Sequence, residues 1–318
     1  MVNHYKGWES YSCFFSAEYT QTFLKKCYKL LKVDDVEKKS YQNCYPFIYF
    51  LEQGKLYYQQ GLNSPLSIQP LLIFYGFVHL IKACLLTLDP SYPSSTSVLA
   101  HGVSTRKRKK QQYRFFQDEV KIQKNGLFTH MAEKMFSIKS LEGEKVKMEN
   151  LLKQIPELTE LFHIMNGQDL FLPIVLNNTT ISIPVQILDT YFMNINRFKN
   201  YLENKNHTPI KNVDQDKHFI TIEFLESLQT FEPLKYNLND RHYYISIAKE
   251  DQSHLPEVLN HYLILYNLSM ISRYETEWWS ELLKTTPNQD YPFIENFLSV
   301  SIQKGPYLIY KFLENRMS

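Results

Sequence analysis

The chain has 318 residues, of which 44% are hydrophobic and 15% aromatic, so it can bury a sizeable core and is globular rather than disordered. Its net charge is only +2, and its nine glycines come no closer together than Gly54 and Gly61. That spacing excludes a Gly-x-Gly-x-x-Gly dinucleotide fingerprint, a P-loop and the Gly-x-Ser-x-Gly elbow of hydrolases.

The first ninety residues contain three segments with helical spacing of apolar side chains. Residues 16–33 predict an amphipathic helix whose amino-terminal cap is Ser16. A second helix is predicted over 43–60, with Pro46 in its first turn. The most apolar segment, 67–88, predicts a third and central helix.

In the rest of the chain the spacing of the apolar residues changes twice, from helical to strand-like and back. Residues 150–162 predict two short helices broken at Pro156. Beyond Gly167, short alternating runs predict strands over 170–176, 180–188, 219–225 and 243–248. Helical spacing returns over 255–274 and 293–313.

This order predicts a mostly helical α+β protein. We expect a helical region over 1–166 with a basic loop at 94–126, a small, mainly antiparallel β unit over 167–250, and carboxy-terminal helices over 251–318. The carboxy-terminal helices should form a bundle with the amino-terminal helices, because their apolar faces are too wide to leave in water. Two independent domains are the alternative.

Several classes of site lack sequence support. The four cysteines include no Cys-x-x-Cys pair, and the ten histidines form no His-x-His or His-Glu-x-x-His motif. The amino terminus lacks the pattern of a signal peptide, and the apolar segment 70–88 carries His79 and Lys82 at its middle, which is costly in lipid. We therefore expect a cytoplasmic protein with no metal, no cofactor and no membrane contact.

The segment after the third helix gathers hydroxyls, a His-Gly pair and most of the excess positive charge. Between Arg106 and Lys124 there are eight Lys/Arg against two acids. Gly102 can adopt positive φ and direct the neighbouring imidazole at an anion. The predicted ligand-binding residues in this segment are Ser97, His101, Gly102, Arg106, Arg108, Lys110 and Arg114. A solvated basic loop is the alternative.

Two helical stripes supply further candidates. Tyr75, His79 and Lys82 share one face of the third helix, and an unpaired buried lysine there has to meet an acid, water or an anionic ligand. A structural His and Lys that bond to a neighbouring helix or lie at the surface are the alternative. In the carboxy-terminal region Arg273 has the fork shape that suits phosphate or carboxylate, or else it pairs with Glu277 on its own helix.

Several blocks of this sequence resemble the YaaC-like family of bacilli. They are Pro70 to Ala83, Ser97-Val-Leu-Ala-His-Gly102, Phe115 to Phe128, Ile155-Pro-Glu-Leu158 and Met270-Ile-Ser-Arg-Tyr274. The resemblance spans most of the chain in order and implies an architecture more than an activity. The Tyr-Gly-x-x-His-x-x-Lys-Ala helix also resembles helices of HEPN-type bundles, many of which are ribonucleases with Arg four to six residues before His.

No arginine of this chain has a histidine at that distance. We therefore expect a non-catalytic binding or regulatory protein whose partner is an anionic ligand, a nucleotide or RNA, or else an acidic protein surface. A nuclease or nucleotide-processing enzyme that uses His79 or His101 is the alternative.

Overall fold

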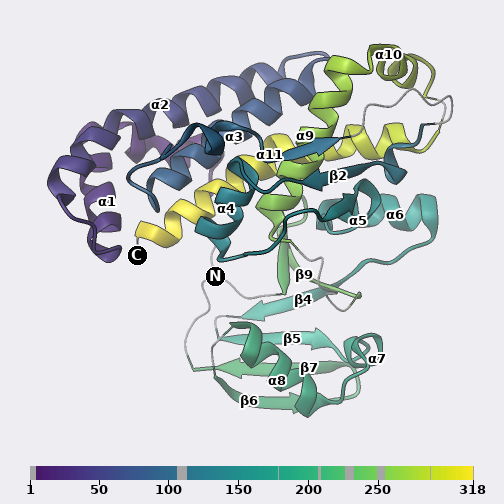
Figure 1. Cartoon of the computed structure of the whole chain (residues 1–318). Coiled ribbons are helices and arrows are strands. Elements are labelled where there is room, and N and C mark those ends of the chain that lie inside the picture. The colour runs from purple at the N-terminus through teal and green to yellow at the C-terminus, as the bar shows by residue number, and fades with distance from the viewer. Residues whose placement is uncertain are drawn as a thin grey trace. The chain divides into compact units, whose positions relative to one another are not determined.

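The computed structural model describes residues 5–105, 113–177, 179–206, 209–225, 233–248, 255–286 and 288–317. They form a mostly helical α+β protein with antiparallel sheets, as the sequence predicts (Figure 1). The chain divides into two compact units. The helical unit comprises the described residues of Tyr5–Leu152 and Leu255–Ser318, and the β unit those of Lys153–His254.

The helical unit is built around α3 (Gln69–Leu86), which packs against α2, α9 and α11. Its other longer helices are α1 (Ala17–Leu30), α2 (Val36–Leu62), α4 (Leu127–Phe136), α9 (Glu257–Tyr274), α10 (Thr276–Thr285) and α11 (Asp290–Met317). Shorter turns are η1 (Gly7–Phe15), η2 (Thr96–Leu99), η3 (Phe115–Gln117) and α5 (Met148–Leu152). Of the described helices, α3 is the one long and apolar enough to cross a membrane, and 67% of it is buried inside the fold.

The helix α2 differs from the sequence prediction because it begins at Val36, so Pro46 lies inside it rather than in its first turn. A proline inside a helix removes one backbone hydrogen bond. A helical conformation of the residues before Pro46 nevertheless places one of their faces in the core, where Ser40 and Cys44 are buried. Packing of this first part of the helix against α1 therefore outweighs the local signal of the proline.

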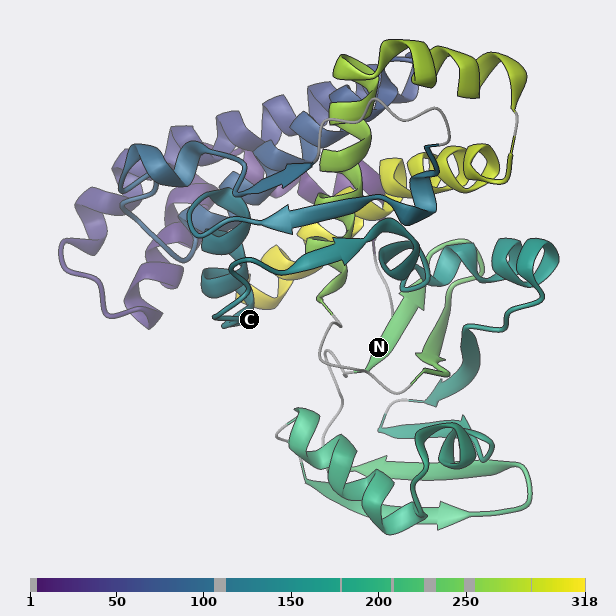
Figure 2. The ribbon, with the colours of Figure 1, turned by 45° about the vertical axis from the view of Figure 1, so that its right-hand side comes forward.

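Glycines bring α2 and α3 close together, and Figures 1 and 2 both show the two helices side by side. A Cβ on Gly54 of α2 would lie 2.6 Å from the Leu80 side chain, and one on Gly76 of α3 would lie 2.8 Å from the Tyr58 ring. The absence of side chains at these positions allows the two backbones to approach. The same approach brings Tyr57 of α2 and His79 of α3 into contact.

A small antiparallel sheet with the order β1-β2-β3 completes the helical unit. It consists of β1 (Val103–Thr105), β2 (Glu119–Ile122) and β3 (Lys145–Lys147). Sequence reasoning did not predict these strands, because runs of three or four residues carry too little alternation to be recognised. The strand β1 begins directly after Gly102 and packs against α9.

The β unit is a six-stranded antiparallel sheet with the order β6-β7-β5-β4-β9-β8 among its described strands. The strands are β4 (Phe171–Asn177), β5 (Thr180–Pro184), β6 (Ile210–Gln215), β7 (Phe219–Phe224), β8 (Leu234–Asn237) and β9 (His242–Ser246). Its helices are α6 (Thr159–Asn166), α7 (Ile187–Tyr191) and α8 (Ile195–Asn206), with a turn η4 (Pro156–Leu158) before α6. Buried side chains of α7 and α8, such as Tyr191 and Phe198, join inward-facing isoleucines of the strands in one core.

One prediction for the β unit was wrong in its extent, and one helix was missed. The strand predicted over 180–188 ends at Pro184 and is followed by α7, since Ile187 turns into the core as part of a helix. The helix α8 was not predicted, because Phe198 and Leu202 are its only fully buried side chains and most of its other residues are polar. Its helical state depends on the sheet that covers this narrow apolar edge.

Candidate functional site

The most distinctive side-chain cluster of the helical unit lies where α2, α3, α9 and the loop before β1 meet. Its members are half-buried, and each is aromatic or basic. We call it the cationic–aromatic surface, and it consists of Phe50, Tyr57, Tyr75, His79, Lys82, His101 and Arg273.

At one end of this surface lies Lys82. Its Nζ is 5.7 Å from the centre of the Phe50 ring, which in turn is 6.0 Å from the His79 ring. The imidazole of His79 stacks on Tyr57, with 5.5 Å between ring centres and 15° between planes. Lys82 forms no ion pair with any carboxylate among the described residues. At this end of the surface a cation therefore lies beside aromatic rings.

At the other end lies Arg273. Its Nη1 donates to the hydroxyl of Tyr75 at 3.5 Å, and its Nε donates to the carbonyl of Ser269 at 3.0 Å. The guanidinium carbon lies 5.1 Å from the centre of the Tyr274 ring. Within the described part of the chain Arg273 makes no ion pair with Glu277 or another acid. The alternative proposed from the sequence, a pair along its own helix, is therefore not what holds this side chain.

His101 lies between these ends. The centre of its ring is 5.1 Å from that of Phe74, 6.1 Å from Tyr75 and 5.6 Å from Tyr266. Its carbonyl accepts hydrogen bonds from the Tyr262 hydroxyl at 2.8 Å and from the backbone N–H of Phe128 at 3.2 Å. These bonds fix the residue against both α9 and α4.

A contact between two glycines sets the backbone at His101. Gly102 has φ +77°, the positive value that the sequence suggests, and Gly126 has φ +139°. A Cβ on Gly126 would lie 2.2 Å from the Cα of Gly102 and 2.9 Å from the carbonyl oxygen of Ala100. Only a residue without a side chain fits there, so Gly126 is a positioning residue for the His101 loop.

Burial and mutual repulsion govern the protonation of this cluster. Burial lowers the pKa of His79 to about 4, with a smaller contribution from the charge of Lys82. Burial lowers the pKa of Lys82 as well. The pKa of His101 is lowered by burial first and then by the charges of Arg273 and Lys82. Both histidines are therefore neutral at pH 7, while the two flanking cations remain without an acid among the described residues.

The remaining predicted residues lie elsewhere or outside the described residues. Ser97 is exposed in η2, and its hydroxyl pairs with that of Ser95 at 2.7 Å. Arg114 is exposed, and its charge acts on the buried Asp290 at the start of α11, where it opposes the rise in the pKa of that carboxyl caused by burial. Arg106, Arg108 and Lys110 lie outside the described residues.

Sequence reasoning missed two members of the surface, Phe50 and Tyr57. Both lie in the helix predicted over 43–60, and nothing in the sequence assigned them to a site. Their seven-residue spacing places them on one face of α2, which is a usable signal. It becomes specific only when the polar stripe of α3 is known to lie opposite.

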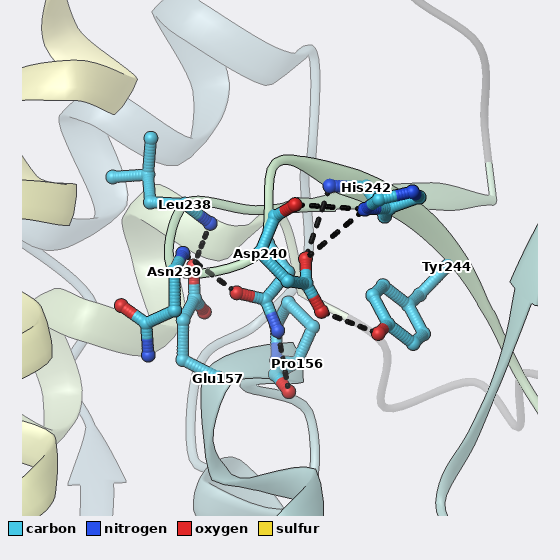
Figure 3. A network of polar contacts seen from close by, with 8 residues as sticks. Pro156, Glu157, Leu238, Asn239, Asp240, His242 and Tyr244 are labelled. Carbon is cyan, nitrogen blue, oxygen red and sulfur yellow. Dashed lines mark hydrogen bonds and ion pairs between the residues drawn. The ribbon is translucent and has the colours of Figure 1, made fainter.

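A second polar cluster lies in the β unit, at the hairpin between β8 and β9 (Figure 3). There the backbone N–H of Leu238 donates to Glu157 Oε1 at 2.9 Å, and that of His242 donates to Asp240 Oδ1 at 3.0 Å. The Tyr244 hydroxyl donates to the other oxygen of Asp240. These bonds close the turn and attach it to η4, so the cluster has a structural role that accounts for its polar groups.

No group of three or more potential metal-binding side chains occurs among the described residues. No curated protein and no solved structure matches this chain. The sequence pattern of the YaaC-like protein family matches residues 12–313, which is nearly the whole chain and includes every residue of the cationic–aromatic surface. The chain therefore belongs to the YaaC-like protein family.

Proposed function

We propose that the helical unit binds an anionic ligand, a nucleotide or RNA, on the cationic–aromatic surface. One observation carries the proposal: Lys82 and Arg273 are half-buried beside aromatic rings, and neither has a carboxylate partner among the described residues. Partial burial of an unpaired cation costs free energy that an anion would recover. The rings favour a ligand that carries a flat base as well as a phosphate.

We infer binding rather than turnover. A general base works best when its pKa lies near the working pH. The pKa of His79 is lowered to about 4, and that of His101 is also lowered. Neither histidine is therefore tuned for proton transfer near neutrality. The negative charge of a bound phosphate would raise both pKa values, so binding should take up protons and be tighter at pH 5.5 than at pH 7.5.

The binding test uses labelled RNA and labelled ATP, with Lys82→Gln and Arg273→Gln as variants. Each variant should weaken the binding of the ligand by about ten- to a hundredfold, because a charge-assisted hydrogen bond is worth about 1.5–3 kcal/mol. Lys29→Gln and Arg197→Gln are matched controls, since both side chains are exposed and outside the surface. Equal losses of affinity in the variants and the controls would show that only the net charge of the protein matters, and would contradict the proposed site.

The basic segment is tested separately. If it also binds phosphate, changing Arg106, Arg108 and Lys110 together to Gln should make the affinity depend less steeply on salt. The slope should fall by about 0.7–0.9 for each phosphate that is no longer neutralised. An unchanged slope would leave this segment as a solvated loop or as a binding region for an acidic protein.

The enzyme alternative has its own test. Purified protein is incubated with RNA and with nucleoside triphosphates, and the products are separated. Hydrolysis that is lost in His79→Ala or His101→Ala would contradict a purely binding role, whereas unchanged substrates together with measurable binding agree with it.

A further inference from the structure

The two cations of the surface lie beside different turns of α3. Arg273 contacts the hydroxyl of Tyr75, while Lys82 lies seven residues further along the same helix. Seven residues of α-helix advance by about 10 Å. A single phosphate group is much smaller than this separation, so it fits one end of the surface or the other.

Aromatic rings fill the interval between these ends. Starting beside Lys82, the sequence of neighbours is His79, Tyr57, Tyr75 and His101, with ring centres 5.5, 6.3 and 6.1 Å apart. Besides burial, the charges of Arg273 and Lys82 both lower the pKa of His101. The surface is thus a row of rings with a cation toward each end.

One class of ligand has the same arrangement. In a nucleic acid strand each base is flanked by two phosphates, and a stacked strand rises about 3.4 Å per nucleotide, so about three nucleotides span 10 Å. Bases stack on aromatic side chains without regard to sequence. We propose that this surface binds a short single-stranded nucleic acid, with phosphates at Lys82 and Arg273 and a base on the rings between them. The proposal rests on the function proposed above and narrows its ligand.

The experiment uses the full-length wild-type protein and a labelled five-nucleotide RNA, followed by fluorescence anisotropy. Competitors are an unlabelled trinucleotide with phosphates at both its 5′ and 3′ ends, the same molecule with its central base removed, AMP, pyrophosphate and a short polyglutamate peptide. Because this comparison needs no variant, a folding defect cannot obscure the result.

The trinucleotide should compete at least about tenfold better than AMP or pyrophosphate, because only it reaches both cations. Removing the central base should weaken it by at least about fivefold, the lower range of stacking on an aromatic side chain. In the variant arm, Lys82→Gln and Arg273→Gln should each bring the trinucleotide close to AMP, while Arg197→Gln leaves the difference unchanged.

The other outcomes each reject a stated part of this proposal. Equal competition by AMP, pyrophosphate and the trinucleotide would overturn the two-ended ligand and leave the proposed anion site standing. Equal competition by the abasic trinucleotide would overturn the base contact. Preferential displacement by polyglutamate would assign the surface to an acidic protein. If the labelled RNA does not bind and direct calorimetric titration detects neither AMP nor pyrophosphate, the proposed function itself fails.

Discussion

Two lysines of the helical unit, Lys82 on α3 and Lys304 on α11, show how differently this fold treats a cation. Lys304 is fully buried, and its Nζ lies 3.0 Å from Glu257 Oε1. The same carboxylate lies 3.9 Å from His261 Nε2, and His261 Nδ1 lies 2.9 Å from the hydroxyl of Ser301. Lys82 is only half-buried and meets an aromatic ring.

The deeper lysine therefore has an acid and a hydrogen-bonded network beside it, while the shallower one has neither among the described residues. A buried charge without compensation is strongly destabilising, so Lys304 requires Glu257. Lys82 keeps partial access to water, and this hydration stabilises its charge without a neighbouring acid. Of these two lysines, Lys82 is therefore the one whose charge no carboxylate among the described residues neutralises.

The largest effect is expected at Lys304. Lys304→Met removes the charge that lies 3.0 Å from the largely buried Glu257 carboxylate, so the free energy of unfolding should fall by about 3–5 kcal/mol, measured by urea denaturation. Lys311→Met is the control on the same helix, because Lys311 pairs with Glu314 near the surface and its loss should cost at most about 1 kcal/mol. Equal losses in the two variants would contradict the distinction between buried and surface pairs.

The second effect concerns the backbone that holds His101. Gly126→Ala should lower the free energy of unfolding by about 2–4 kcal/mol, since the new Cβ meets the Gly102 backbone at a positive φ. Gly143→Ala is the matched control, because Gly143 also has positive φ, +82°, but has no atom within 4 Å of a Cβ. Gly143→Ala should lower the free energy of unfolding by only about 1 kcal/mol, the cost of a side chain at positive φ. A Gly126→Ala variant no less stable than the control would mean that the glycine contact is not a constraint.

A third, smaller effect concerns the pair between His130 Nε2 and Asp89 Oδ2, which are 3.3 Å apart. The polar contact with His130 lowers the pKa of Asp89 below its ordinary 3.8, against the effect of burial. A lowered carboxyl pKa contributes stability above the ordinary value, and this contribution is lost as pH falls through the lowered one. Asp89→Asn should therefore cost about 1–2 kcal/mol at pH 7 and progressively less below about pH 4. A cost that does not depend on pH would show that the carboxylate charge has no role.

The smallest effect is expected at Lys82. Lys82→Met should change the free energy of unfolding by at most about 0.5 kcal/mol, or raise it, because a desolvated cation without an acid is removed. Lys55→Met is the matched control, since Lys55 lies 5.5 Å from the Phe15 ring centre in a similar contact. A much larger destabilisation by Lys82→Met than by the control would mean that the fold depends on this cation.

The same variant reports on protonation. Removing the Lys82 charge should raise the pKa of His79 above about 4, while burial keeps it below 6.5. The pKa is measured from the His79 proton resonance during a pH titration. Because the pKa of His79 is lowered in the folded state, His79 reduces the stability of the protein as pH falls from 6.5 to that lowered pKa. With a higher pKa in the Lys82→Met variant, this pH range becomes narrower and the total loss of stability becomes smaller. An unchanged His79 pKa would place the two groups too far apart to share a ligand.

Much of the helical architecture could be predicted from the sequence, because long apolar periods leave few alternatives. The segment 67–88 became α3, and its stripe of Tyr75, His79 and Lys82 stays on one half-buried face, as a period of 3.6 residues requires. Short strands such as β1 and the polar helix α8 could not be predicted, because their conformation depends on neighbours distant in sequence.

The sequence by itself determined which residue types were available for a site: a polar stripe on an apolar helix, a His-Gly turn and an isolated Arg273. Only the tertiary structure decided which of them meet. It joined the stripe to Arg273 and His101, added Phe50 and Tyr57 through the close approach of α2 and α3, and gave Ser97 and Arg114 other neighbours. The physical reason is that periodicity fixes the face of a helix on which a side chain lies, whereas long-range packing fixes what that face meets.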